Sequence, residues 1–514
     1  MKNKLKIVSG ILATTFLLAA CGGENNETTN NETNANQEDN QTGNELLTIA
    51  NPADINTFDP HNNSVITTSA VLVNVYNKLV KRDADGEIIA DLATSWENTD
   101  DVTWEFQLNE DVTFHNGDSF TAEDVKFSLE RLASDSSLLQ HGIFSGIDSV
   151  NVVDETTVEV VTSEPDPQLL SRLSTVGASI LPADYFDEVG IDEFLQHPIG
   201  TGPYEYSEWN QDDYVELTKY ADYFENDPVW DTVQFQVVPE DSTRVSELLT
   251  GGIDVAFNIP SADIARIDEN DGTHAAIEPI QRVIQLWLST EDDAATADPV
   301  VREAIDLAID NQVIIDEILE GNATPTKTHV TPGNFGADES LYDTYDYDPE
   351  RAQELLAEAG YEDGVTVEIS ANNYYREIGE VVGGMLAAVG IEADMEMVEQ
   401  SQFADRLFNN ELREGVLVGW GNDMFDGSIL ELFYEDNVTS YSNPDVDALL
   451  DDAAYNMNEE ERAAQYEEIQ QVIAEERPAV YLFQLQGRYG VSDRIDYTPR
   501  LDELYYVDEI QLSE

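Results

Sequence analysis

The sequence predicts an α/β protein, and two patterns carry this prediction. Beyond residue 298, segments with apolar residues at helical spacing alternate with short strand-like runs, which is typical of helices packed on a largely parallel sheet. Residues 46–90 and 200–285 instead read mainly as strands and turns. Apolar residues make up 41% of the chain, and the roughly 470 residues from Leu46 onward are enough for two or three domains with sizeable cores.

Asp-Pro dipeptides mark two helix starts in the C-terminal half. They open predicted helices from Asp298 to Gly321 and from Asp348 to Gly360, because Asp caps a helix, Pro suits its first turn and Gly ends it. Further on, the pattern predicts a strand over 365–369, a helix over 376–389, a strand over 391–397, a short helix over 403–409, a strand over 416–420, a helix over 459–476 and a strand over 479–484.

Two more elements are expected in the N-terminal half. Residues 102–114 alternate apolar and polar side chains around an Asn-Glu-Asp break, which predicts a β-hairpin. Residues 121–132 follow with apolar residues at positions that suit a helix.

The N-terminus has the features of a secretory signal peptide. Three lysines precede a mostly apolar stretch over 7–20, which is shorter than the ~20 apolar residues that span a bilayer comfortably. Leu18–Cys21 resembles a bacterial lipobox, which implies cleavage before Cys21 and acylation of its thiol. Cys21 is the only cysteine of the chain. The alternative is an ordinary cleaved signal with a chance cysteine.

A polar segment follows the cysteine. Residues 22–45 contain one apolar side chain, Ala35, so they cannot form a core and are expected to be a disordered tether. With a lipid at its start, this segment would anchor the folded body to the membrane, since two acyl chains give stable attachment.

The charge balance is strongly acidic. The chain has 24 Lys and Arg against 105 Asp and Glu, for a net charge of −81. Such a surface repels nucleic acid and anionic lipid headgroups, which excludes both as partners. Its self-repulsion is screened at ~1 M salt, where the Debye length is ~3 Å. We therefore expect a salt-adapted, halophilic protein that works outside the cell.

Motifs of the common enzyme and metal-site classes are absent. The sequence has no G-x-S-x-G, H-E-x-x-H, P-loop or G-x-G-x-x-G motif, and its six histidines show no metal-ligand spacing. Nothing in the sequence argues for an enzyme, a cofactor or a metal.

The segment Gly419–Asp423, GWGND, stands out by its position. It follows the predicted strand over 416–420, and in open α/β sheets ligands bind in the crevice beyond the carboxyl ends of strands.

Several long blocks resemble the peptide/nickel-binding family of extracellular solute-binding proteins, family 5, which serve ABC importers. They include ADLATSWE and VTWEFQLNEDVTFHNGDSFTAEDVKFSLER within 90–131, PIGTGPYEYSEWN at 198–210, and VREAIDLAIDNQVIIDEILEGNATP from Val301. Together with the Gly-Trp block they cover essentially 46–510 in the order of the family.

The resemblance implies a two-lobed periplasmic-binding-protein fold of type II with the extra domain of family 5. The implied parts are a signal over 1–20, a tether over 21–45, domain I over 46–90, 200–285 and 485–514, domain II over 91–199 and domain III over 286–484. The lobes would close on a short peptide by a hinge, and a monomer anchored on the extracellular face of the cytoplasmic membrane would deliver it to the permease subunits.

The resemblance also implies ligand-binding residues. Asp423 matches an aspartate that pairs with the α-ammonium of a bound peptide, and Asp426 is its rival in the same loop. Either could instead be one of 105 mostly solvated acids. Arg376 stands where some dipeptide binders clamp the peptide carboxylate, with a surface ion pair as the alternative.

Further candidates for the pocket lining are Trp420, Asn422, Tyr374, Tyr375 and Trp287. Core packing is the alternative for both tryptophans, and solvent exposure for both tyrosines. The turn Met424–Gly427 departs from the usual family pattern, so a glutathione-like ligand, a nickel chelate or haem stays open, as does a role as a peptide-signal receptor.

Overall fold

The computed structural model describes residues 46–422, 425–435 and 437–513. Cys21, the predicted tether and Asp423 therefore lie outside the described residues. Within the described ranges no helix is both long enough and apolar enough to cross a lipid bilayer.

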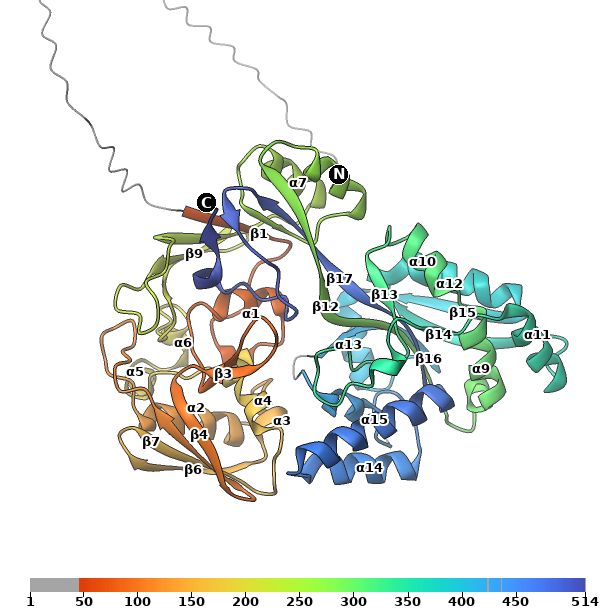
Figure 1. Cartoon of the computed structure of the whole chain (residues 1–514), viewed down its shortest axis with the longest axis horizontal. Coiled ribbons are helices and arrows are strands. Elements are labelled where there is room, and N and C mark those ends of the chain that lie inside the picture. The colour runs from red at the N-terminus through yellow and green to blue at the C-terminus, as the bar shows by residue number, and fades with distance from the viewer. Residues whose placement is uncertain (1–45, 423–424, 436, 514) are drawn as a thin grey trace, which may run out of the picture. The chain divides into compact units, whose positions relative to one another are not determined.

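A sheet of eleven strands runs through the whole folded body. Its strand order is β15-β14-β16-β12-β17-β11-β1-β10-β9-β8, and β13 (Ala323–Pro325) pairs with β17. The long antiparallel strands β12 (Thr273–Leu288) and β17 (Ala479–Ser492) lie at its centre and join two lobes (Figure 1). The first lobe carries β1 and β8–β11, and the second lobe carries β14–β16.

The second lobe confirms the predicted alternation of helices and strands. Its strands β14 (Val365–Asn372), β15 (Ile391–Val398) and β16 (Gly415–Gly421) pair in parallel, whereas β16 is antiparallel to β12. Helices cover both faces of this sheet, as expected for parallel strands. One core joins the sheet to α9 (Pro299–Ala308), α10 (Asn311–Glu317), α11 (Pro349–Glu358) and α12 (Arg376–Ala388), and another joins it to α13 (Gln400–Phe408), α14 (Pro444–Tyr455) and α15 (Glu459–Glu476).

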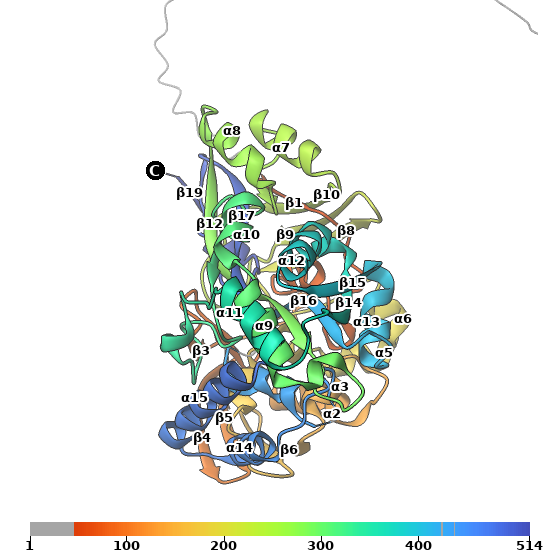
Figure 2. The same cartoon turned by 90° about the vertical axis from the view of Figure 1, so that its right-hand side faces the viewer.

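Most helix boundaries of this lobe follow the predicted signals. Asp298 and Asp348 cap α9 and α11 through their side chains, and α15 covers the predicted range. Helices α9 and α11 lie side by side (Figure 2). The single helix predicted from Asp298 to Gly321 is wrong. It divides into α9 and α10, because the side chain of Asp310 accepts a hydrogen bond from the backbone of Val313 and starts a new helix.

The first lobe contains more helix than the sequence predicted. Its parallel strands are β1 (Leu46–Asn51), β10 (Thr232–Val237) and β11 (Val255–Phe257), and β8 (Tyr204–Asn210) and β9 (Tyr214–Lys219) extend the sheet in antiparallel pairing. Reading residues 46–90 and 200–285 as mainly strands and turns missed three short helices, α1 (Ile66–Leu72), α7 (Asp241–Leu249) and α8 (Ile264–Asp268). The connection from β10 to β11 passes through α7, as parallel pairing around β1 requires.

A separate four-stranded sheet belongs to the first lobe. Its order is β4 (Ala93–Asp100), β5 (Thr103–Leu108), β7 (Thr157–Thr162) and β6 (Ile147–Asp154), and α2 (Ala122–Ser134) packs on it. The hairpin predicted within 102–114 is wrong, because β5 pairs with β4 and β7 rather than with residues 112–114. The predicted helix is confirmed, and Thr121 caps it.

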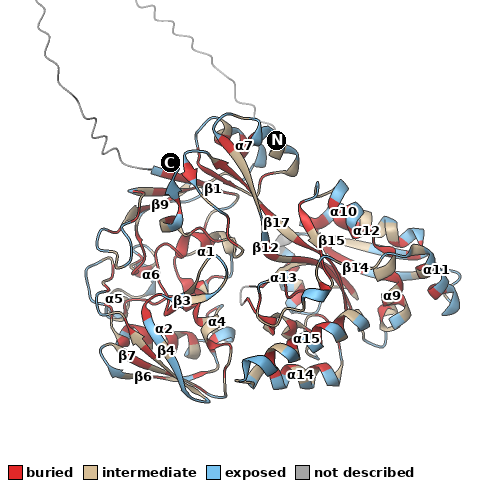
Figure 3. Ribbon diagram, viewed as in Figure 1, coloured by how far each residue is buried: buried red, intermediate tan, exposed pale blue. Residues whose placement is uncertain are grey.

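Many strands of both lobes consist largely of buried residues (Figure 3). Short elements complete the first lobe. The short elements are β2 (Val80–Arg82), β3 (Ile88–Ala90), α3 (His141–Phe144), α4 (Leu169–Leu173), α5 (Ala183–Val189) and α6 (Ile191–Phe194), with β18 (Ile495–Asp496) and β19 (Gln511–Leu512) near the C-terminus. The domain boundaries implied by the family resemblance stay predictions.

Candidate functional site: the seam between the lobes

Strands β12 and β17 change register where they pass from one lobe to the other. The pairing shifts between Pro279 and Val283 of β12, which marks an irregularity at this point of the sheet. We use the word seam for the residues of both lobes that contact each other beside this crossing.

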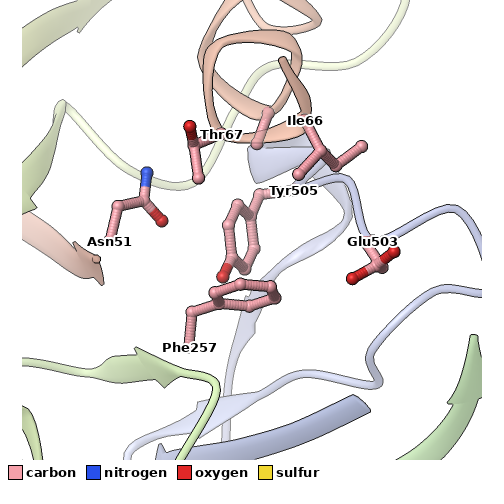
Figure 4. Close-up of a pocket in the computed structure, with 7 residues that line it drawn as sticks. Asn51, Ile66, Thr67, Phe257, Glu503 and Tyr505 are labelled. Atoms are coloured by element: carbon pink, nitrogen blue, oxygen red, sulfur yellow. The ribbon is translucent and has the colours of Figure 1, made fainter. Parts of the chain in front are cut away.

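A hollow lies in the first lobe next to the crossing strands (Figure 4). It contains about 180 Å³ of empty space, partly open to solvent, and its lining includes Asn51, Ile66, Phe257, Glu503 and Tyr505. Glu503 also forms an ion pair of 3.3 Å with Arg282 of β12. Glu503 therefore links the hollow to the crossing strand β12.

The Gly-Trp motif forms the carboxyl end of β16 and contacts Tyr375. A Cβ atom on Gly419 would lie 2.2 Å from the Tyr375 hydroxyl oxygen, so only glycine fits here. Tyr375 is buried, and burial raises the pKa of its phenol to about 12. The nearby Arg282 guanidinium partly opposes that shift. Gly419, Tyr375 and Arg282 thus pack together at the edge of the seam.

Asn422 follows β16 and has a structural role. Its backbone N–H donates to the Gln281 carbonyl at 2.9 Å, and its side chain donates to the Asp426 carbonyl at 3.0 Å. Gln281 in turn bonds to Thr331 and Asn334 in a buried network of amides. These bonds hold the two ends of the segment that contains Asp423.

Asp426 is occupied as a helix cap. Its carboxylate oxygen Oδ1 accepts from the backbone of Ser428 at 2.9 Å and from the Ser428 hydroxyl, which starts the 3-10 helix Gly427–Phe433. The side chain is buried, with 4% exposed, and burial raises the pKa of its carboxyl group. The hydrogen bonds from Ser428 and the positive charges of Arg82 and Arg172 oppose that shift in part. Asp426 therefore acts as a helix cap through its Oδ1 atom.

Two direct contacts cross the seam farther along. The guanidinium of Arg82 lies over the Phe425 ring at 4.8 Å from its centroid. The Gln168 side chain, at the N-cap of α4, donates to the Tyr466 hydroxyl of α15 at 2.8 Å. No local pattern predicted these two pairings, because the partners are hundreds of positions apart in the chain.

The other predicted site residues lie in different environments. Trp287 is only 1% exposed and packs in the core of the second lobe, 5.5 Å from the partly buried Trp420 ring, which favours core packing for Trp287. Arg376 is exposed, donates to Asn373 and lies 4.0 Å from Glu380, which favours the surface ion pair. Tyr374 is 67% exposed, yet its hydroxyl accepts a bond of 3.0 Å from Asn258 of the first lobe.

Metal ligands do not gather in the described part of the chain. In the ranges 46–422, 425–435 and 437–513, no three His, Cys, Asp or Glu side chains are grouped so that they could hold a metal ion.

Comparisons with known proteins agree over most of the chain. Residues 87–440 match the family model of the bacterial extracellular solute-binding proteins, family 5. The glutathione-binding protein GsiB of Salmonella typhi is 29% identical over 456 residues, which cover 85% of this chain and 88% of that protein. GsiB of Escherichia coli O157:H7 matches with the same identity and coverage.

Solved structures extend the similarity to the fold. The periplasmic binding protein DppA from Helicobacter pylori, in complex with the peptide STSA, has a TM-score of 0.78 and 26% identity, covering 91% of this chain and 98% of that one. The substrate-binding protein CtaP from Listeria monocytogenes has a TM-score of 0.82 at 23% identity, covering 91% and 99%, which indicates a shared fold.

Proposed function

Because the chain belongs to the bacterial extracellular solute-binding proteins of family 5, which are substrate-binding components of ABC importers and not enzymes, we propose that it captures short peptides at the seam. The lobes close on the peptide by bending of β12 and β17 at the register shift, and the closed form delivers it to a membrane permease.

The observation that carries this proposal is the likeness to a peptide complex over nearly the whole fold. The Helicobacter protein holds a tetrapeptide and is 26% identical to this chain. The seam adds a place for such a ligand, because the hollow, the Gly-Trp end of β16 and the bonded pair Asn422 and Asp426 lie near the same crossing.

The first experiment identifies the ligand directly. The protein without its first 45 residues is purified in high salt and denatured, and the released molecules are analysed by mass spectrometry. A set of short peptides supports the proposal. A single non-peptide species, or no release together with no thermal shift on adding di- to pentapeptides, contradicts it.

Asp423 is the proposed partner of the peptide ammonium. Asp423→Ala should weaken peptide binding strongly with no loss of folding, measured by calorimetry and thermal unfolding. Asp405→Ala, which removes an exposed acid of the same lobe, is the matched control. Unchanged affinity in Asp423→Ala removes this residue from the site.

Glutathione is the second candidate ligand, because GsiB relatives at 29% identity are named for it. Glutathione is a peptide with a γ-linked glutamate, so the same type of site could hold it. Competition between glutathione and trialanine in one calorimetric titration decides between the two. A peptide-signal receptor is a further alternative, and loss of peptide uptake on gene deletion would exclude it.

Lipid anchoring at Cys21, a monomeric state and adaptation to salt belong to the same proposal. Cys21→Ala should release the protein from the membrane into the medium. The net charge of −81 should make folding depend on salt, so the melting temperature should fall at low ionic strength. An unchanged melting temperature at low salt contradicts the adaptation.

A further inference from the structure

Phe425 occupies an unusual position at the seam. Its φ angle is +56°, in the left-handed region that bulky residues rarely adopt, and its side chain is only 6% exposed. A strained backbone with a buried ring persists only where the surroundings hold it. The backbone is held by a bond of 3.0 Å from the Phe335 N–H to the Phe425 carbonyl.

The first lobe provides a seat for this ring. A Cβ atom on Gly86 would lie 3.1 Å from Cδ1 of Phe425, so the absence of a side chain at Gly86 leaves room for the ring. The Arg82 guanidinium covers the ring and is itself fixed by bonds to the Gly86 carbonyl and the Ser171 hydroxyl. The ring of one lobe therefore fits a site formed by the turn between β2 and β3 of the other.

This contact lies beside the hollow. Arg500 donates to the backbone carbonyls of Arg82 and Asp83, at 2.9 and 3.0 Å, and so holds the β2–β3 turn. The same C-terminal loop then supplies Glu503 and Tyr505 to the lining of the hollow. The hollow and the seat of Phe425 are thus built on one loop.

A second contact joins the two lobes next to the contact of Phe425. The bond from Gln168 to Tyr466 joins α4 to α15, which face each other across the seam in Figure 1. Tyr466 also packs against Gly427, where a Cβ atom would lie 2.3 Å from its ring. Gly427 follows Phe425 by two residues, so the two contacts across the seam are adjacent.

We infer that Phe425, seated on Gly86 and Arg82, limits the length of the ligand, so that the site takes di- and tripeptides and excludes longer ones. This inference rests on the proposed function. The Phe425 ring fills the space against Gly86 and Arg82, and the bond from Gln168 to Tyr466 lies beside it, so the two lobes are in direct contact where a longer peptide would have to pass. Each additional residue lengthens an extended peptide by ~3.3–3.6 Å. The contact of Phe425 with Gly86 and Arg82 leaves no space for this added length.

The test is a length series of alanine peptides with free termini, from two to six residues, measured by calorimetry on the protein without its first 45 residues. The wild type should bind trialanine about tenfold or more tightly than pentaalanine. Phe425→Gly removes the ring, and glycine accepts the positive φ without strain, so pentaalanine affinity should rise about tenfold relative to trialanine.

Tyr347→Gly is the matched control, since it removes a half-exposed aromatic ring from a loop of the same lobe away from the described contacts. It should leave the length preference unchanged. Equal affinity for all lengths in the wild type, or an unchanged ratio in a folded Phe425→Gly variant, overturns the inference and leaves the proposed function in place. Failure of peptides of every length to bind the wild type overturns both. The wild-type series is decisive even where the variant does not fold.

Discussion

The two lobes present different chemistry to each other at the seam. The first lobe contributes Arg82 and Arg172, and the second contributes Asp426 and Glu431, both with carboxyl pKa values raised chiefly by burial. The chain has only 24 Lys and Arg against 105 acids, yet the charges of Arg82 and Arg172 lower the pKa of Asp426, and that of Arg172 lowers the pKa of Glu431, against the effect of burial. The net charge of the chain therefore does not describe the seam, where positive side chains of the first lobe lie near acids of the second.

The two lobes also differ in how closely their side chains pack at the seam. In the second lobe, glycines stand where any side chain would collide with Tyr375 or Tyr466. In the first lobe, the contacts are long polar side chains such as Arg82 and Gln168. A side chain added at one of these glycines should thus cost more stability than the loss of one polar contact from the first lobe.

The largest effect is expected from Gly419→Ala. The added Cβ would lie 2.2 Å from the Tyr375 hydroxyl and 2.8 Å from Ile284, so the strand or the tyrosine must move. We expect a loss of about 1–3 kcal/mol in the free energy of unfolding, together with weaker ligand binding. Denaturant unfolding measures the first and calorimetry the second.

Gly384→Ala provides the control for this change. Gly384 lies in α12 and a Cβ there would meet nothing within 4 Å, so alanine should leave stability unchanged or raise it by up to ~1 kcal/mol. Equal losses in both variants would contradict the close packing at Gly419.

Arg82→Met should have the next largest effect. It removes the bonds to Gly86 and Ser171 and the cation over Phe425, and leaves Asp426 with less positive charge nearby. Hydrogen bonds to charged groups suggest a loss of about 2 kcal/mol, seen in thermal unfolding and in ligand affinity. Arg351→Met, at an exposed ion pair on α11, is the control and should change neither. A stable, tightly binding Arg82→Met would show that the first lobe's cation is dispensable.

Tyr466→Phe should have a smaller effect. The substitution keeps the ring that packs on Gly427 and removes only the acceptor for Gln168. A loss of about 1 kcal/mol is expected, because a single neutral hydrogen bond contributes ~0.5–1.5 kcal/mol. Urea unfolding of this variant is compared with Tyr455→Phe, where the ring is half-exposed on α14. Equal urea midpoints for the two variants would show that the hydrogen bond from Gln168 to Tyr466 does not contribute to stability.

Asp426→Asn should have the smallest effect of the four variants, and the size of that effect should depend on pH. A carboxyl pKa raised on folding means that the native state binds the proton more tightly, so stability falls as pH rises from the ordinary value of 3.8 through the raised one. Asparagine caps helices as well as aspartate does and has no such titration, so the variant should gain stability relative to wild type as pH rises.

Unfolding free energies between pH 4 and pH 8 measure this gain. Asp452→Asn, on the exposed side of α14, controls for the loss of one charge. A gain in unfolding free energy that shrinks as pH rises would contradict a raised carboxyl pKa of Asp426 in the folded state.

Local signals predicted most of the second lobe. The ranges of α11, α12 and α15 and the strands around Gly419 follow from capping residues and periodicity that act within a few positions. The same local reasoning correctly placed the Gly-Trp motif at the carboxyl end of a strand, but it misjudged the continuous helix to Gly321.

The sequence by itself determined the family, the helix and strand types of the second lobe and the acidic surface, because these depend on composition, spacing and ordered motifs. Only the tertiary structure decided that β5 pairs with β4 and β7, that Trp287 is core, and that Phe425 meets Gly86. Those contacts join segments far apart in the chain, and their partners are selected by packing and burial of the whole fold, which no local pattern records.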